Sequence, residues 1–153
     1  MKNSIITFLS ILICFVTFGA EITSTGSGDW EDPATWDLGR VPDDGDIIVV
    51  AATHTVTLTT TNGDCEDGPA STHGYVFGTL TFTNGSGLRL LAGSSLTIEI
   101  GGLLDGGIGG GDSKKLYIGG TELWNSGDPD VPGFFVFGTP LPIELSSFEA
   151  AQT

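Results

Sequence analysis

Short runs of alternating apolar residues, repeated at an even spacing, are the feature that most limits how this chain can fold. Leucine recurs every eight residues at Leu80, Leu88 and Leu96, and a second apolar residue follows each of them two positions later. Alternation with a period of two is typical of β-strands that bury one face, and glycine, asparagine or serine separates the runs. The pattern predicts short strands joined by tight turns.

The same period continues on both sides of this repeat, so we expect an all-β chain. Further strands are expected at Lys115–Ile118 and Phe134–Phe137. Gly101–Asp112 is too rich in glycine to predict an ordinary strand, and we expect it to be rich in turns or very closely packed. The residues expected to point inward are Ile47, Val49, Val56, Leu58, Leu80, Phe82, Leu88, Leu90, Leu96, Ile98 and Ile100.

Evenly spaced short strands are compatible with more than one architecture. They can form a meander of hairpins, as in a β-sandwich, or they can be successive sides of a β-solenoid. In a solenoid, each coil stacks its apolar side chains on those of the coil before it. Periodicity alone leaves both architectures open.

The first 20 residues have the parts of a secretory signal peptide. Basic Lys2 precedes an apolar run from Ile5 to Phe18, and the small residues Gly19 and Ala20 follow. The run is shorter than the roughly 20 apolar residues that a membrane-spanning helix needs. We therefore expect residues 1–20 to be removed on export, 21–139 to form the β-domain, and 140–153 to be a linker and the first strand of a further domain.

The charge of the exported chain limits its partners. Loss of Lys2 leaves four basic side chains against 19 acidic ones, which is a formal net charge of −15. Such a surface repels nucleic acid and anionic lipid, and it repels an acidic polysaccharide unless a cation lies between them. Cys65 is then the one cysteine left, so we expect no intramolecular disulfide.

Three tryptophans are candidates for contacts with a glycan, because their faces can stack on sugar rings. Trp30 and Trp36 lie six residues apart near the start of the domain, and Trp124 lies in a polar segment. The alternative is burial, since a buried tryptophan removes about 150–250 Å² from water. Burial is the expected role of Trp30 and Trp36, which leaves Trp124 as the better candidate for an exposed stacking surface.

A group of three carboxylates, Asp43, Asp44 and Asp46, is the candidate calcium site. Calcium prefers six to eight oxygen ligands, and these residues supply three carboxylates within four positions. The alternative is that they are solvated turn residues. The segment at 106–112 (GGIGGGD) approaches a glycine-rich calcium repeat, but it occurs once, whereas that fold needs stacked copies.

Residues typical of catalysis are scarce. His54 and His73 are the two imidazoles, and the chain lacks the GxSxG, HExxH and CxxC arrangements. We expect His54 to be a surface residue and the domain to be non-catalytic. The alternating threonines from Thr53 to Thr61 and from Thr79 to Thr83 are similar to ice-binding ladders, but exposed strand faces also favour threonine.

The domain opens with Trp30, Ala34–Trp36, Gly39, Val41–Pro42 and Gly45–Asp46, and this order resembles the opening of the G8 domain, a family of extracellular modules. The resemblance covers about Thr25 to Ala150, and it rests on Trp30, Ala34–Trp36, Gly39, Val41–Pro42, Gly45–Asp46, Ile48–Val49, Val56–Leu58, Gly78–Phe82 and Ile118–Gly120. It implies an extracellular domain rich in β-strands and related to β-helical architecture. It implies no active site, although some larger relatives act on hyaluronan.

The segment Leu141–Phe148 (LPIELSSF) is similar to a phrase that follows such modules in secreted and surface proteins of Bacteroidetes. There it leads to a further β-domain and a sorting domain for type IX secretion. No sorting domain follows here, so the expected location is outside the cell or on its surface, or the periplasm if that domain is truly absent.

Together these observations predict a non-catalytic recognition or structural module that binds a polysaccharide or another cell-surface component, with calcium as its one candidate cofactor. The alternatives are a structural spacer in a larger surface protein and a fragment of a polysaccharide-active enzyme.

Overall fold

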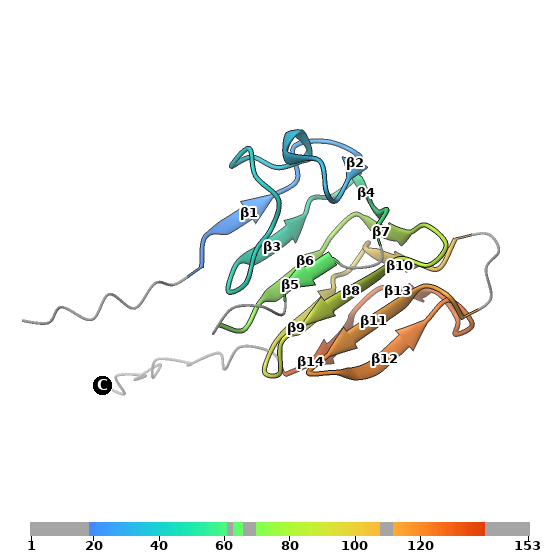
Figure 1. Cartoon of the computed structure of the whole chain (residues 1–153). Coiled ribbons are helices and arrows are strands. Elements are labelled where there is room, and N and C mark those ends of the chain that lie inside the picture. Colours follow the sequence, from blue (N-terminus) through green and yellow to red (C-terminus); the bar gives the residue numbers. More distant parts are fainter. Residues whose placement is uncertain (1–18, 61–62, 66–69, 108–111, 140–153) are drawn as a thin grey trace, which may run out of the picture.

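Strands that follow one another along the chain lie on different sides of the molecule, and each pairs with the strand one coil away. In the computed structural model, Thr55 pairs with Thr79 and Thr79 pairs with Leu103, so one coil takes about 24 residues, which is in the range of solenoid repeats. The result is a three-sided β-solenoid of about 3 turns (Figure 1). The predicted solenoid is therefore confirmed, and the meander and sandwich alternatives are wrong.

The structure describes residues 19–60, 63–65, 70–107 and 112–139. Most of the expected signal peptide, the expected linker at 140–153 and much of the GGIGGGD segment lie outside the described residues. Within the described part of the chain, no helix is long and apolar enough to cross a membrane.

Three sheets form the sides of the solenoid. Sheet 1 consists of β1 (Glu21–Thr23), β3 (Ile47–Val50), β6 (His73–Val76), β9 (Ser95–Ile98) and β14 (Phe135–Gly138). Sheet 2 consists of β2 (Gly28–Asp29), β4 (Thr55–Leu58), β7 (Thr79–Phe82), β10 (Leu103–Asp105) and β13 (Val131–Pro132). Sheet 3 consists of β5 (Gly63–Cys65), β8 (Gly87–Leu90), β11 (Lys115–Ile118) and β12 (Thr121–Asn125).

The last coil runs in the reverse direction. All other neighbouring strands are parallel, but β12, β13 and β14 pair antiparallel with β11, β10 and β9. The chain turns back after β11 at Gly119 and Gly120, which both have positive φ values that glycine adopts without a steric penalty. The coil that ends the stack therefore visits the three sheets in the opposite order.

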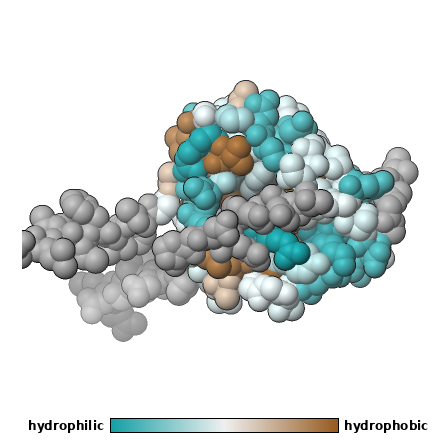
Figure 2. All heavy atoms as spheres, in the orientation of Figure 1, coloured by the Kyte–Doolittle hydropathy of each residue, from teal (hydrophilic) through white to brown (hydrophobic). Residues whose placement is uncertain are grey.

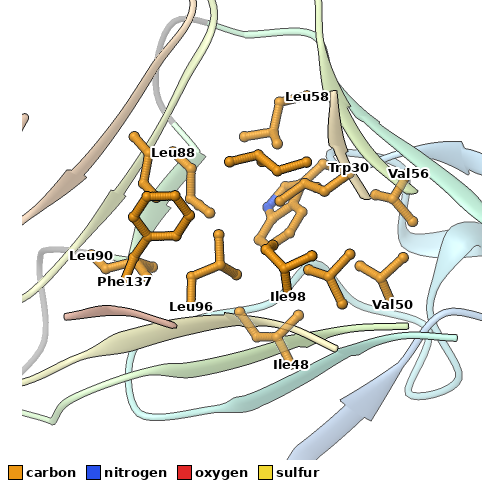
Figure 3. Packing of buried hydrophobic residues seen from close by; sticks show 14 of the residues in the cluster. Trp30, Ile48, Val50, Val56, Leu58, Leu88, Leu90, Leu96, Ile98 and Phe137 are labelled. Atoms are coloured by element: carbon orange, nitrogen blue, oxygen red, sulfur yellow. The ribbon is translucent and has the colours of Figure 1, made fainter. Parts of the chain in front are cut away.

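The eight-residue spacing of the leucines corresponds to one side of the solenoid. Leu80, Leu88 and Leu96 lie in β7, β8 and β9, one in each sheet, and all three are buried. Leu88 and Leu96 point into the interior among apolar side chains of the other coils (Figure 3), and Leu80 belongs to the same buried cluster. The buried apolar residues in the strands of sheets 1, 2 and 3 are Ile22, Ile48, Val50, Val76, Leu96, Ile98, Phe137, Val56, Leu58, Leu80, Phe82, Leu104, Leu88, Leu90, Leu116, Ile118 and Trp124.

The predicted orientation of β3 is wrong by one residue. Ile48 and Val50 point inward and are 3% and 2% exposed, whereas Ile47 and Val49 are only half-buried. The four residues of this strand are all apolar, so alternation carries no information about which pair faces the core. The structure fixes the face through the parallel pairing of Ile48 with Gly74.

Two further predictions fail where turns interrupt the pattern. Ile100 is 84% exposed because β9 ends at Ile98 and the chain turns outward. The glycine-rich segment does contain a strand, β10, whose Leu104 is fully buried beside Leu80. Gly102 allows this because a side chain there would collide with the backbone of Val76 in the coil below.

The alternating threonines form a ladder only two coils deep. Thr55 and Thr57 of β4 lie beside Thr79 and Thr81 of β7 on the outer face of sheet 2. In the next coil their places are taken by Leu103 and Asp105. The threonines thus serve as outward-facing strand residues rather than as a ladder of many coils.

The register of β3 can be tested with two neighbouring substitutions. Ile48→Ala is expected to lower the free energy of unfolding by about 2–4 kcal/mol, because it leaves a cavity in a filled interior. Ile47→Ala is expected to cost about 1 kcal/mol or less, because its side chain is already partly in water. Urea unfolding followed by circular dichroism measures both, and a larger loss for Ile47→Ala would contradict the register.

Candidate functional site

The first two tryptophans close the N-terminal end of the solenoid. The first coil places strands in sheets 1 and 2 but none of the described strands in sheet 3, and the segment after β2 folds back so that Thr35–Asp37 bond to Thr23–Thr25 at the end of β1. Trp30 and Trp36 lie on this segment, 3% and 2% exposed, with ring centroids 5.2 Å apart and the rings nearly perpendicular. Trp36 Nε1 donates a hydrogen bond of 2.8 Å to the Trp30 carbonyl oxygen.

The third tryptophan fills the opposite end. Trp124 lies on β12 in the reversed coil, pairs with Leu116 and is 3% exposed. Its ring packs against Phe82 with centroids 5.6 Å apart, and its Nε1 donates to the carbonyl oxygen of Pro129 at 3.1 Å. The expected burial of Trp30 and Trp36 is therefore confirmed. The candidate role of Trp30, Trp36 and Trp124 in stacking on a glycan is wrong, and so is the expected exposure of Trp124, because all three rings are buried.

The acidic residues around the first two tryptophans hold backbone groups in place. Asp32 caps the short 3₁₀ helix η1 (Pro33–Thr35) by accepting from the Ala34 N–H at 2.9 Å. Asp37 accepts from the N–H of Thr23 on edge strand β1 at 3.0 Å. Glu31 accepts from the N–H and hydroxyl groups of Thr59 and Thr60, just beyond β4.

Asp46 is the buried residue of the predicted calcium site, and the guanidinium of Arg40 binds its carboxylate. Arg40 donates two hydrogen bonds to its carboxylate, at 2.6 and 2.9 Å, and Asp46 also accepts from the N–H groups of Ala20 and Asp43. Burial alone would raise the pKa of Asp46, but the bonds from Arg40 and the Asp43 N–H lower it overall.

The predicted calcium site at Asp43, Asp44 and Asp46 is wrong for this reason. A cation would have to displace the guanidinium of Arg40, which already neutralises the buried carboxylate. Asp43 directs its Oδ1 to the N–H of Asp44 at 2.8 Å. Among the described residues, no group of three or more His, Cys, Asp or Glu side chains is placed to hold a metal ion.

Each of the two histidines forms a hydrogen bond with a different serine hydroxyl. His54 is half-buried rather than a surface residue, with Nδ1 2.9 Å from Ser24 Oγ. His73 is buried, with Nδ1 2.9 Å from Ser95 Oγ, and burial lowers the pKa of His73. Among the described residues, neither histidine has a hydrogen bond or ion pair with a carboxylate, so these residues do not form the arrangement of a catalytic triad.

Among the described residues, the cavity beside Trp30 in the interior is too small for a sugar. The cavity that remains beside Trp30 measures about 10 Å³ and is lined by core side chains such as Ile48, Leu88 and Leu96. That is about the space of one water molecule. This interior cavity is therefore not a binding site for a sugar.

The outer face of sheet 3 carries a polar hollow of about 100 Å³. Alternation along β8 and β11 buries their leucines and turns Arg89, Lys115 and Tyr117 outward. Gly87, which pairs with Lys115, contributes no side chain, so the sheet surface is low at that point. The residues lining the hollow are Gly85, Ser86, Gly87, Arg89, Ser113, Lys115 and Tyr117.

Charged groups in the hollow are held by their neighbours. The guanidinium carbon of Arg89 lies 4.1 Å from the centre of the Tyr117 ring, a cation–π contact. At the rim, Lys115 Nζ lies 2.8 Å from Glu122 Oε2, which also accepts from the Tyr117 hydroxyl at 3.3 Å. The hydrogen bond to Glu122 raises the pKa of Lys115, so the ammonium stays charged at neutral pH.

The sequence analysis did not identify this hollow. A signal was present, because Arg89 lies between Leu88 and Leu90, and Tyr117 lies between Leu116 and Ile118. Both residues are therefore outward positions of strands. The sequence alone does not show that these two strands pair, since one coil of the solenoid separates them.

Comparison with known protein families, characterised proteins and solved structures finds no match to this chain.

Because Asp46 has a structural role, its substitution should lower the stability of the fold, and calcium should not change that stability. Asp46→Asn is expected to lower the free energy of unfolding by about 1–3 kcal/mol, because it removes a charged acceptor from Arg40 and from two backbone N–H groups. Asp43→Asn is the control, since Asp43 is exposed and should matter less. Thermal unfolding with millimolar calcium or with a chelator should give the same midpoint, and stabilisation by calcium would contradict the assignment.

Burial of His73 predicts that stability falls in mild acid. Its pKa in the folded chain is below the usual 6.5, so the unfolded chain takes up the proton more readily. Its contribution is therefore fully present above pH 6.5 and is lost as the pH falls toward the lowered pKa. His73→Gln should reduce the slope of unfolding free energy against pH below 6.5. An unchanged slope in His73→Gln would contradict this assignment.

Proposed function

We propose that this chain is an exported, non-catalytic recognition module that binds a glycan on the outer face of sheet 3. The observation that carries the proposal is the polar hollow, which combines an aromatic side chain with a guanidinium and hydroxyl groups. These are the groups with which proteins bind sugars, because rings stack on aromatic side chains while hydroxyls exchange hydrogen bonds with polar ones.

The size of the hollow limits which part of a glycan can enter it. At about 10–15 Å³ for each water molecule, the measure used above for the interior cavity, its volume of about 100 Å³ holds several water molecules. It therefore accommodates one polar substituent of a sugar, while the ring lies on the adjoining face of the sheet beside Tyr117. In the orientation of Figure 1, the visible surface is mainly hydrophilic, with apolar residues in a few small areas (Figure 2).

A purely structural spacer is the second candidate. It is favoured by the burial of all three tryptophans, which makes them part of the fold. In either case we propose a G8-like module of a secreted or surface protein, supported by the opening motif around Trp30 and Trp36 and by the signal peptide expected in residues 1–20.

Affinity electrophoresis of the chain without residues 1–20 tests the recognition function. Native gels that contain soluble xylan, β-glucan or pectate are compared with gels that contain no polysaccharide. At least one polysaccharide is expected to retard the protein. Tyr117→Ala should abolish the retardation, because it removes both the aromatic side chain and the support of Arg89.

Tyr75→Ala is the matched control, since Tyr75 is the other tyrosine and lies on the outer face of sheet 1 in β6. Retardation that survives in this variant but not in Tyr117→Ala locates the site. Equal loss in both variants would contradict the location. No retardation in any gel would overturn glycan binding and leave the spacer.

A further inference from the structure

The basic side chains of this acidic chain differ in whether the fold already uses them. Four basic side chains lie in the described residues, and two of them are committed to the fold. Arg40 is paired with buried Asp46, and Lys114 is 2% exposed with its Nζ bonded to the carbonyl oxygen of Gly106. The other two, Arg89 and Lys115, both line the hollow on sheet 3.

Arg89 is the less neutralised of the two. Lys115 has Glu122 as an ion-pair partner, whereas Arg89 forms no ion pair among the residues whose side chains the structure describes, a set that does not include Asp64, its register partner on β5. Its recorded contact is the face of Tyr117, which holds the guanidinium in place without satisfying its N–H donors. Arg89 therefore presents oriented donors and a positive charge to the hollow.

A second group in the hollow also lacks a partner. The hydroxyl oxygen of Ser113 is buried and has no hydrogen-bond partner among the described residues. A buried polar atom without a partner costs roughly 1–3 kcal/mol. A ligand that forms a hydrogen bond with this hydroxyl would remove that cost. The hydroxyl can donate or accept, so the preference for an acceptor comes from Arg89, whose N–H groups only donate.

We propose that the hollow is a subsite for one acidic group of a sugar, held by Arg89 and Ser113 with Lys115 at the rim. This inference rests on the proposed function, because it names the ligand class of the same site. A carboxylate is planar and matches the fork of a guanidinium with two parallel hydrogen bonds, which makes a uronic acid the substituent of best fit.

The net charge of the domain restricts the inference further. A polymer with an acid on every sugar is repelled by the surrounding carboxylates, whereas one acidic substituent meets a local positive charge. The ligand class is therefore a mainly neutral glycan with isolated uronic acids. Added salt should raise the affinity for a polyanion such as pectate, because it screens the long-range repulsion.

The test titrates the ¹⁵N-labelled chain without residues 1–20 with xylotetraose carrying one glucuronic acid and, as a matched neutral probe, with plain xylotetraose. The acidic probe is expected to bind at least about tenfold more tightly, the size expected for one charge-assisted interaction. The largest chemical-shift changes should fall on the amides of Gly87, Arg89 and Ser113. Arg89→Gln should reduce the affinity for the acidic probe to that for the neutral one.

Thr55→Glu is the control for net charge. It lowers the charge by one, as Arg89→Gln does, but at an exposed position on sheet 2. It should leave the preference for the acidic probe unchanged. Equal loss of preference in both variants would show a general charge effect and overturn the subsite.

Further arms of the titration separate the other outcomes. Tighter binding of N-acetylglucosamine 6-sulfate than of free glucuronate would replace the carboxylate with a sulfate and overturn the uronic acid assignment. Equal binding of the neutral and acidic tetraoses at sheet 3 would overturn the acidic subsite but keep glycan recognition. If neither the tetraoses nor the polysaccharides of the gel panel bind, both proposals fail.

Discussion

The structure depends on closing the two ends of a stack. Each coil of a β-solenoid buries its apolar side chains against the coils on either side, so the first and last coils need a cover of another kind. Trp30 and Trp36 provide it at the N-terminal end, and Trp124 provides it inside the reversed last coil. Since we expect no intramolecular disulfide in the exported chain, the packing of these large side chains supplies stability that a cross-link would otherwise provide.

This requirement explains why function is to be sought on an outer face. The interior is filled and the large tryptophan rings are used to close it, so none remains as a platform for a sugar. The carboxylates near the first two tryptophans are likewise engaged, as Asp46 with Arg40 shows. Side chains at outward strand positions do not close the ends of the solenoid. In β8 and β11 they bring Arg89 and Tyr117 together over a low point in sheet 3.

The sequence predicted the parts of the fold that alternation encodes. The strands at Leu80, Leu88 and Leu96 were predicted because polar and apolar residues alternate there, whereas Ile47–Val50 offered no contrast and its face was predicted wrongly. Strand β6 (HGYV) was missed since Gly74 stands at an inward position, where a side chain would collide with Leu96. The hollow was missed because it needs the pairing of β8 with β11, which depends on the path of a whole coil.

The most direct test of this account is the environment of the tryptophans in solution. With all three buried at the ends of the solenoid, the fluorescence of the folded chain should be blue-shifted relative to that of the unfolded chain. Acrylamide should quench it only weakly, and a bound glycan should leave that quenching unchanged. Emission at the wavelength of free tryptophan, with strong quenching that a glycan suppresses, would contradict the account, because it would place a tryptophan on the surface as a binding platform.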